Sequence, residues 1–462
     1  MGGEWREVRL GEVADINPDA IGPDWPYAHI RYVDISSVGE GVVVEPPKVI
    51  NLEEAPSRAK RLVREGDTVL STVRPGRRSM FFVSAPEPDL VVSTGFAVLR
   101  PKAGILHPRY LYACVFDKAF TDYLVSREKG AAYPAVLPED IADATVNLPP
   151  LPEQRAIAHI LGTLDDKIEL NRRMSETLEA MARALFKAWF VDFEPVRAKM
   201  EGRWRRGQFL PGLPVRLYDL FPDRLVDSEL GEIPEGWRAA RLGDVLAELV
   251  SGGRPKGGAA LEGVPSIGAE NVIGLGKYDF SKEKYVPREF FKELQRKGAA
   301  VRPGDVLLYK DGAQIGRKSF FDSDFPHPEC AINEHVFILR CKRAYWQRYL
   351  FFWLDQDWMT QEIISLNSNS AQPGINQEGV RSLPFLMPPD SVVEAFDRLA
   401  EPLTDRLFAG CLESRTLAAL RDALLPKLIS GEIRVRDAER LISRMTETKA
   451  RMNHGNSLRK PR

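Results

Sequence analysis

The clearest pattern along the chain is an apolar stripe at helical spacing between residues 153 and 190. Its members recur mostly in alternating steps of four and three residues: Ile157, Leu161, Leu164, Ile168, Met174, Leu178, Met181 and Leu185. These steps are typical of a coiled-coil seam, and polar Asn171 lies near the middle of it. Pro152 and Glu153 suit the first turn of a helix. The stretch predicts one helix about 57 Å long, at 1.5 Å per residue.

A second stripe of the same kind runs from Val392 to Ser430 and stops at Gly431. Its apolar members are Phe396, Leu399, Leu403, Leu407, Leu417, Leu420, Leu424 and Leu428. Two equivalent long helices, each with one apolar face, bury those faces most simply by pairing with each other. We expect the pair to act as a spacer between globular parts.

The pattern ahead of each stripe is strand-like. Short β-rich runs such as Thr68–Val73 and Val336–Leu339 are broken by glycine and proline turns. Helical stretches follow around His107–Ser126 and Tyr345–Leu366. This alternation predicts two α+β globular parts.

The chain is an internal duplication, because five segments recur in the same order at offsets of 232 to 240 residues. The pairs are Trp5–Val13 with Trp237–Val245, Gly66–Leu70 with Gly304–Leu308, Val98–Arg100 with Ile338–Arg340, Leu148–Pro150 with Met387–Pro389, and Leu178–Leu185 with Leu417–Leu424. We therefore expect globular domains at 1–150 and 237–389, helical spacers at 151–193 and 390–435, a linker at 194–236, and a flexible basic tail at 436–462.

Composition adds limits to this picture. The 462 residues are 44% hydrophobic with four cysteines, and no stretch approaches the roughly 18 apolar residues of a membrane span. We expect a cytoplasmic protein with no membrane association and no disulfide framework. The net charge is −1, yet basic residues cluster at 57–79, at 288–318 and in the tail from 443. Such clusters either contact phosphates locally or are solvated faces. The same two interpretations apply to the run Arg197–Arg206.

The search for catalytic motifs finds no set that would make the chain an enzyme. Asn147–Pro150 lacks the adjacency of a methyltransferase tetrad, and Gly312–Ser319 lacks phosphate-loop spacing. Asp165-Asp166-Lys167 resembles part of a nuclease set but falls in the predicted helix. Four residues are of types that bind zinc, but their spacing matches neither a CxxC knuckle nor a zinc finger. They are interpreted as structural: His327, Cys330, His335 and Cys341.

Several segments together resemble the specificity subunit of type I restriction–modification enzymes. They are Leu148–Ile157, Leu164–Asn171, Trp189–Pro195, Ile233–Trp237 and Arg241–Val245. The resemblance covers nearly the whole chain except the basic tail. The second copy departs from the pattern, because Val392-Val393-Glu394 stands where the first has Glu153-Gln154-Arg155. We expect the second helix to begin differently.

The resemblance implies an α+β, pseudo-two-fold molecule with two target recognition domains separated by a long antiparallel two-helix coiled coil. Each domain would read one half of a bipartite double-stranded DNA sequence. Two methyltransferase subunits would dock on the chain, and nuclease–translocase subunits would complete the restriction complex. S-adenosylmethionine, ATP and magnesium would belong to those partners, and this chain would hold no cofactor and no metal.

Contact residues follow from the chemistry of base and phosphate recognition, in which Arg, Lys, Asn and Gln predominate. In the first domain the candidates lie on two loops: Thr72, Arg74, Arg77, Arg78 and Tyr133. In the second domain they occupy the corresponding loops: Lys310, Gln314, Arg317, Lys318, Gln372, Asn376 and Gln377. Each could contact a base, contact a phosphate or serve the turn. The competing hypotheses are a self-contained methyltransferase or nuclease and a coiled-coil scaffold without DNA contact.

Overall fold

The computed structural model describes residues 4–130, 132–322, 324–367 and 374–440. The chain forms two compact units, one of Met1–Lys167 with Leu417–Arg462 and the other of Ile168–Thr416. Each unit thus combines one globular domain with one part of each long helix. Among the described residues, no helix is both long and apolar enough to cross a membrane. Most of the basic tail, from residue 441, lies outside the described residues.

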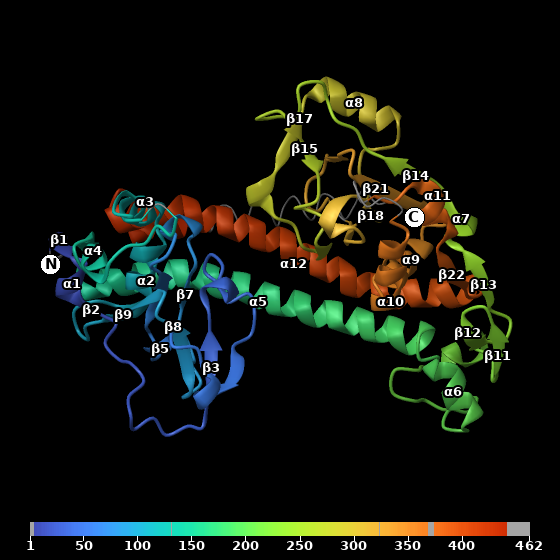
Figure 1. Cartoon of the computed structure of the whole chain (residues 1–462), viewed down its shortest axis with the longest axis horizontal. Helices are drawn as coiled ribbons and strands as arrows, with labels where there is room; N and C mark the ends of the chain where they lie inside the picture. Colours follow the sequence, from blue (N-terminus) through green and yellow to red (C-terminus); the bar gives the residue numbers. More distant parts are fainter. Residues whose placement is uncertain (1–3, 131, 323, 368–373, 441–462) are drawn as a thin grey trace. The chain divides into compact units, whose positions relative to one another are not determined.

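The first unit contains two four-stranded sheets, ordered β2-β9-β6-β7 and β4-β3-β8-β5, and the pair β1-β10 (Figure 1). The strands are β1 Arg6–Arg9, β2 Ala14–Ile16, β3 His29–Val33, β4 Lys48–Asn51, β5 Ala59–Leu62, β6 Thr68–Ser71, β7 Met80–Phe82, β8 Leu90–Ser93, β9 Phe96–Pro101 and β10 Thr145–Leu148. The helices are α1 Leu10–Val13, α2 Pro108–Phe116, α3 Lys118–Ser126 and α4 Pro138–Ala142. Helix α2 packs on β6, β7 and β9 and buries its apolar face there.

The second unit repeats this plan with a five-stranded sheet, β14-β21-β18-β19-β16, a three-stranded sheet, β17-β15-β20, and the pairs β13-β22 and β11-β12. The strands are β11 Leu225–Ser228, β12 Gly231–Pro234, β13 Arg238–Arg241, β14 Leu246–Ser251, β15 Val264–Ile267, β16 Gly274–Leu275, β17 Lys284–Val286, β18 Asp305–Tyr309, β19 Lys318–Phe321, β20 Ala331–Ile332, β21 Val336–Cys341 and β22 Pro384–Met387. The shorter helices are α6 Glu194–Met200, α7 Leu242–Val245, α8 Arg288–Arg296, α9 Trp346–Leu354, α10 Asp357–Ser365 and α11 Gln377–Ser382.

The recurring sequence segments become neighbouring strands. In the first domain Val69 of β6 pairs with Val98 of β9 in an antiparallel ladder. In the second, Leu307 of β18 pairs with Ile338 of β21 in the same way. All four side chains are fully buried, so the repeated segments form the centre of each core. The expected pair of similar α+β domains is confirmed.

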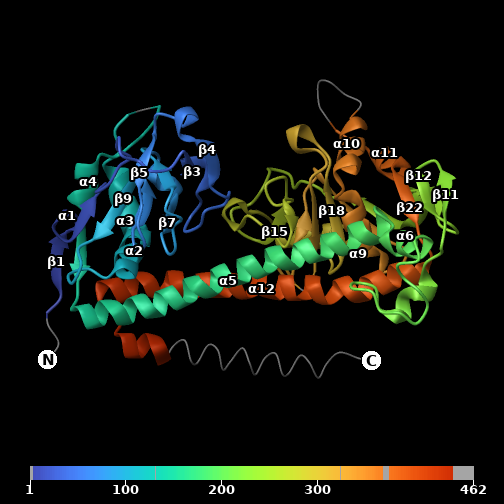
Figure 2. The ribbon, with the colours of Figure 1, turned by 90° about the horizontal axis from the view of Figure 1, so that it is seen from below.

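The two long helices are α5 Leu151–Phe190 and α12 Asp390–Ser430. In the first unit Asp165 of α5 pairs with Arg421 of α12, at 3.0 Å between Oδ1 and Nη1. In the second unit Asn171 donates to Glu413 at 2.9 Å, and the ring of Phe186 lies 5.8 Å from that of Phe396. Residue numbers rise along α5 as they fall along α12 in the second unit, so the helices are antiparallel there, as expected. Figure 2 shows this pairing within each unit.

Each domain's opening strand segment packs against the end of the long helix that belongs to the other sequence copy. In the first unit the ring of Trp5 covers Gly431, where an added Cβ would lie 3.4 Å from the ring. In the second unit Trp237 packs on Phe190 and Phe193, with ring centroids 5.8 Å apart in both cases. The duplicated sequence therefore crosses over, since each unit needs both copies to complete its core.

The start of the second long helix differs from that of the first, as the sequence indicated. Gln154 of α5 is buried and its amide donates to the carbonyls of Pro149 and Ile105 while accepting from the amide of His107. Val393 of α12 is fully buried and apolar at that place. At this position the first helix is anchored by hydrogen bonds and the second by apolar packing, while Asp390 at the start of α12 accepts from Trp346 at 3.0 Å.

The positively charged run in the linker bonds largely within its own unit. Lys199 lies 3.9 Å from the ring centroid of Tyr218 and donates to the carbonyl of Phe221. Arg203 pairs with Glu194 at 2.7 Å. These contacts favour a structural surface over a second phosphate site.

Candidate nucleic-acid interface

An ion pair with a buried aspartate joins the same two strands in each domain, at the strand ends opposite the candidate loops. Arg100 and Asp67 form two hydrogen bonds, at 2.9 and 2.7 Å, in the first domain. Arg340 and Asp305 form two at 2.7 Å in the second. Paired, planar contacts of this kind hold both groups in one orientation. Since each pair joins the strands that lead to the loops, the loops start from the same framework.

The backbone frame of the loops is also the same in the two domains. Thr72 donates its amide to the carbonyl of Gly95 and its own carbonyl accepts from Val136, at 2.9 Å each. Lys310 donates to His335 and accepts from Ile375, at 3.0 Å each. The structure thus brings the two sequence-predicted loops of each domain together, residues 72–78 beside 132–136 and residues 309–317 beside 374–377.

Arg74 and Tyr133 form the exposed tip of the first domain's loops. The Arg74 guanidinium carbon lies 5.3 Å from the Tyr133 ring centroid, and 75% of Tyr133 is exposed. Arg74 has φ 50°, a left-handed conformation that side chains with a Cβ adopt at a cost. The equivalent residue of the second domain is Gly312, with φ 69°. Arg78 has the same conformation, with φ 55°, opposite Gly316, so the exposure of Tyr133 beside Arg74 is what favours a contact role for this pair.

The other candidates on this loop differ in accessibility. Arg77 is exposed, whereas the Thr72 hydroxyl already donates to the carbonyl of Gly95 at 2.9 Å. Arg78 turns inward: its guanidinium donates to Glu40, to Thr121 and to the carbonyl of Phe116. The contacts of Arg78 therefore favour the turn-structure alternative over base contact.

In the second domain, Gln314 and Arg317 are exposed neighbours on the loop, and the guanidinium of Arg317 donates to the amide oxygen of Gln314 at 3.0 Å. The ammonium group of Lys310 donates to Ser251 at 3.2 Å and lies 4.7 Å from the Phe337 ring centroid. Lys310 is therefore half-buried at the edge of the loop, and the two exposed residues extend beyond it.

Lys318 lies within the core of the second domain. It is 6% exposed, its ammonium group donates to Thr360 of α10, and burial lowers its pKa to about 8. Strand pairing matches it to Met80 of the first domain, since each stands opposite a leucine of the neighbouring strand. The sequence interpretation of Lys318 as a DNA contact does not fit this burial. Because Lys318 follows the basic residue Arg317, the sequence interpretation assigned it to the loop instead of to the start of β19.

The second loop of the second domain is only partly described. Gln372 lies outside the described residues. Asn376 caps α11, because its side chain accepts from the amide of Gly379 at 2.7 Å. Gln377 is exposed in the first turn of that helix. Asn376 and Gln377 are both exposed, but the side-chain oxygen of Asn376 is already used in the cap.

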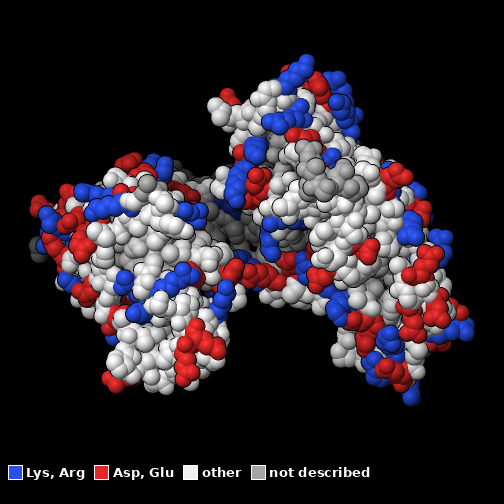
Figure 3. All heavy atoms as spheres, in the orientation of Figure 1, with Lys and Arg blue, Asp and Glu red and all other residues white. Residues whose placement is uncertain are grey.

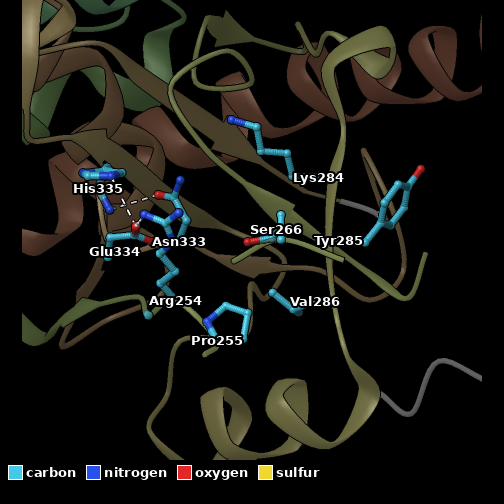
Figure 4. Close-up of a pocket in the computed structure, with 11 residues that line it drawn as sticks. Arg254, Pro255, Ser266, Lys284, Tyr285, Val286, Asn333, Glu334 and His335 are labelled. Atoms are coloured by element: carbon cyan, nitrogen blue, oxygen red, sulfur yellow. Dashed lines mark hydrogen bonds and ion pairs between the residues drawn. The ribbon is translucent and has the colours of Figure 1, made fainter. Parts of the chain in front are cut away.

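A hollow in the second domain, of about 230 Å³, was not anticipated from the sequence (Figure 4). Its polar lining includes Arg254, Lys284, Asn333, Glu334 and His335. His335 occupies the frame position that Gly95 holds in the first domain. The sequence signal that could have identified the hollow is this difference: a histidine stands beside the loop where the first copy has a glycine.

The residues weighed as catalytic or metal-binding do not form such a site. His327 contacts Glu283 and Arg415, while His335 contacts Asp311 at 2.7 Å. Asp165 pairs with Arg421, and burial raises its pKa. Among the residues that the structure describes, no group of three or more His, Cys, Asp or Glu side chains could hold a metal ion.

The basic clusters of the sequence do not form a single-sign surface on the face drawn in Figure 3, where Lys and Arg are interspersed with Asp and Glu. On α8, for example, Arg288 pairs with Glu329, and Lys292 pairs with Glu289 at 2.8 Å. Local contacts at the loops are therefore better candidates for recognition than bulk attraction.

Comparison with known proteins finds similarity to a family of DNA specificity domains. Residues 2–180 match the model of the type I restriction modification DNA specificity domain. The HindI specificity subunit of Haemophilus influenzae is 25% identical, with 93% of this chain and 100% of that protein covered. The MjaIX specificity subunit of Methanocaldococcus jannaschii is also 25% identical, with 89% and 85% covered. A solved S subunit of a type I restriction–modification system from M. genitalium is 12% identical, with a TM-score of 0.55 and 92% and 96% covered. That structure supports the fold.

Proposed function

We propose that the chain is a specificity subunit of a type I restriction–modification system and that its two loop pairs are the surfaces that read the two halves of a bipartite DNA target. Its role is DNA recognition without catalysis. The first reading surface consists of residues 72–78 and 132–136, and the second of residues 309–317 and 374–377. The observation that carries this assignment is the shared backbone frame with different side chains. A constant frame with variable side chains suits two readers of different sequences.

We further propose the partners and cofactors. Two methyltransferase subunits dock on this chain, and nuclease–translocase subunits join to complete the restriction complex in the cytoplasm. S-adenosylmethionine binds to the methyltransferase subunits, and ATP and magnesium serve the nuclease–translocase. The named relatives are specificity subunits, which supports this division of labour.

Footprinting of the assembled methyltransferase on DNA with each half-site scrambled in turn tests the proposal. Arg74→Ala should weaken binding to DNA that carries the first domain's half-site and leave the other half-site unaffected. Equal loss at both halves would contradict two independent readers. Methylation by the purified chain alone would contradict the non-catalytic role, and affinity that does not fall with salt would favour a scaffold without phosphate contacts.

A further inference from the structure

The hollow in the second domain adjoins the proposed reading surface. The carbonyl of His335 accepts from the amide of Lys310 at 3.0 Å, and its ring Nδ1 lies 2.7 Å from the carboxylate of Asp311. Lys310 and Asp311 begin the loop 309–317. The hollow is therefore continuous with the loop.

One carboxylate is held in place inside this hollow. Oε1 of Glu334 lies 3.3 Å from Nε2 of His335 and 3.8 Å from Nη1 of Arg254. Figure 4 shows these three side chains gathered on one side of the hollow, with Tyr285 apart from them. About a third of the Glu334 side chain is exposed. Both contacts are made through Oε1, so Oε2 is placed to accept a hydrogen bond from a ligand.

The charge of the hollow does not suit a phosphate. Arg254 and Lys284 are its cations; Arg254 lies beside Glu334, and Lys284 lies 3.8 Å from Glu270, a carboxylate outside the lining. A phosphate site needs an excess of positive charge, whereas a base edge presents donors and acceptors together. The mixed lining therefore fits the edge of a base pair.

The first domain lacks these groups at the equivalent positions. The frame matches Glu334-His335 to Thr94-Gly95. Conversely, Arg74 of the first domain corresponds to Gly312 of the second. The two domains thus carry their distinctive polar side chains at different positions of one backbone frame.

We propose that Glu334 is a specificity-determining residue of the second domain. Its carboxylate accepts a hydrogen bond from the exocyclic amino group of a base, cytosine N4 or adenine N6, in the major groove. Arg254 and His335 are positioning residues that hold the carboxylate. This assignment rests on the proposed function, because it requires the second domain to lie on DNA.

The test is the methylation motif of a host that carries the complete system with Glu334→Ala, read by sequencing that detects methylated bases. One position of the second half-site should lose at least about tenfold of its discrimination between bases. All other positions should stay as they are. Glu334→Gln should shift the preference at that position toward adenine, since an amide pairs with adenine N6 and N7.

The matched control is Glu329→Ala, which removes an exposed carboxylate paired with an arginine, Arg288, outside the hollow. It should leave the motif unchanged. An unchanged motif with Glu334→Ala in an active complex would overturn the inference, as would equal loss at both half-sites. A wild-type complex that methylates no bipartite motif would instead overturn the proposed function.

Discussion

The two recognition domains agree in their supports and differ at their tips. Both join the two central strands by an Asp–Arg pair at one end and hold the loops at the other end by the same two backbone hydrogen bonds. The first domain then presents Arg74 beside Tyr133, and the second presents a hollow with Glu334. The difference teaches that one backbone framework can present different side chains at its loops.

A second comparison concerns cations that are basic in the sequence but internal in the fold. Arg78 of the first domain and Lys318 of the second stand at positions two residues apart in the repeat. They nevertheless donate to matching threonines, Thr121 on α3 and Thr360 on α10. In each domain, therefore, a basic side chain holds a helix against the rest of the domain, but the two side chains come from different positions of the repeat.

The largest expected effect comes from breaking the shared support. Asp67→Ala and Asp305→Ala should each lower the free energy of unfolding by about 2–4 kcal/mol, because each removes two charge-assisted hydrogen bonds, while Arg100 keeps Asp19 and Arg340 keeps Glu248. Denaturant unfolding of the full chain measures the loss. Asp143→Ala, which removes an exposed pair with Arg9, should cost less than about 1 kcal/mol. A large loss for only one of the two buried aspartates would break the equivalence of the domains.

The next prediction distinguishes a DNA contact by Arg74 from a role of Arg74 in the stability of the loop. Arg74→Gly places at this position the glycine that the second domain has at Gly312. It should weaken binding of the first half-site by about 1–3 kcal/mol, as for a base-reading arginine. Stability should not fall, because glycine relieves the left-handed backbone. Titration with DNA and thermal unfolding measure the two effects. Lower stability with unchanged binding would assign Arg74 to the support.

A smaller effect is expected from Lys318→Met, which copies Met80 of the first domain. Removing a buried ammonium group should raise the free energy of unfolding at pH 7 by about 1–2 kcal/mol. The pKa of Lys318 is lowered from 10.5 to about 8, so the unfolded chain binds more protons between these values and wild-type stability rises with pH there. The gain from the substitution should therefore shrink toward pH 10.5.

Unfolding curves at pH 7 and pH 10 measure this difference. DNA recognition should be unchanged, since Lys318 is buried. A gain that is constant with pH would mean that the methionine acts through packing alone. Loss of recognition of the second half-site would instead indicate that Lys318 contacts DNA.

The smallest effect concerns exposed arginines on the two loops. Arg77→Ala and Arg317→Ala should each weaken binding to all DNA sequences alike and reduce the slope of log affinity against log salt by about 1. Binding curves over a salt series measure the slope. A change confined to one sequence would show that the arginine reads a base.

The sequence alone determined the architecture, because apolar periodicity and internal repetition are properties of the chain itself. The stripe that includes Ile157 and Leu161 predicted α5, and the matched segments at Gly66 and Gly304 predicted equivalent strands. It also identified the two loops of each domain, since glycine and proline between strands mark turns. Those signals are local, and local signals survive without knowledge of the fold.

Tertiary structure alone decided which polar side chains face outward. Lys318 and Arg317 are adjacent and basic, yet Lys318 begins strand β19, whose four residues are all buried, whereas Arg317 lies in the exposed loop before it. Arg78 and Arg77 differ in the same way, because a helix packed against the loop takes one guanidinium. Glu334 became a candidate because Arg254 and His335 contact its carboxylate, and Arg254 comes from a distant segment of the chain. Burial and partnership depend on contacts distant in sequence, and no spacing along the chain encodes them.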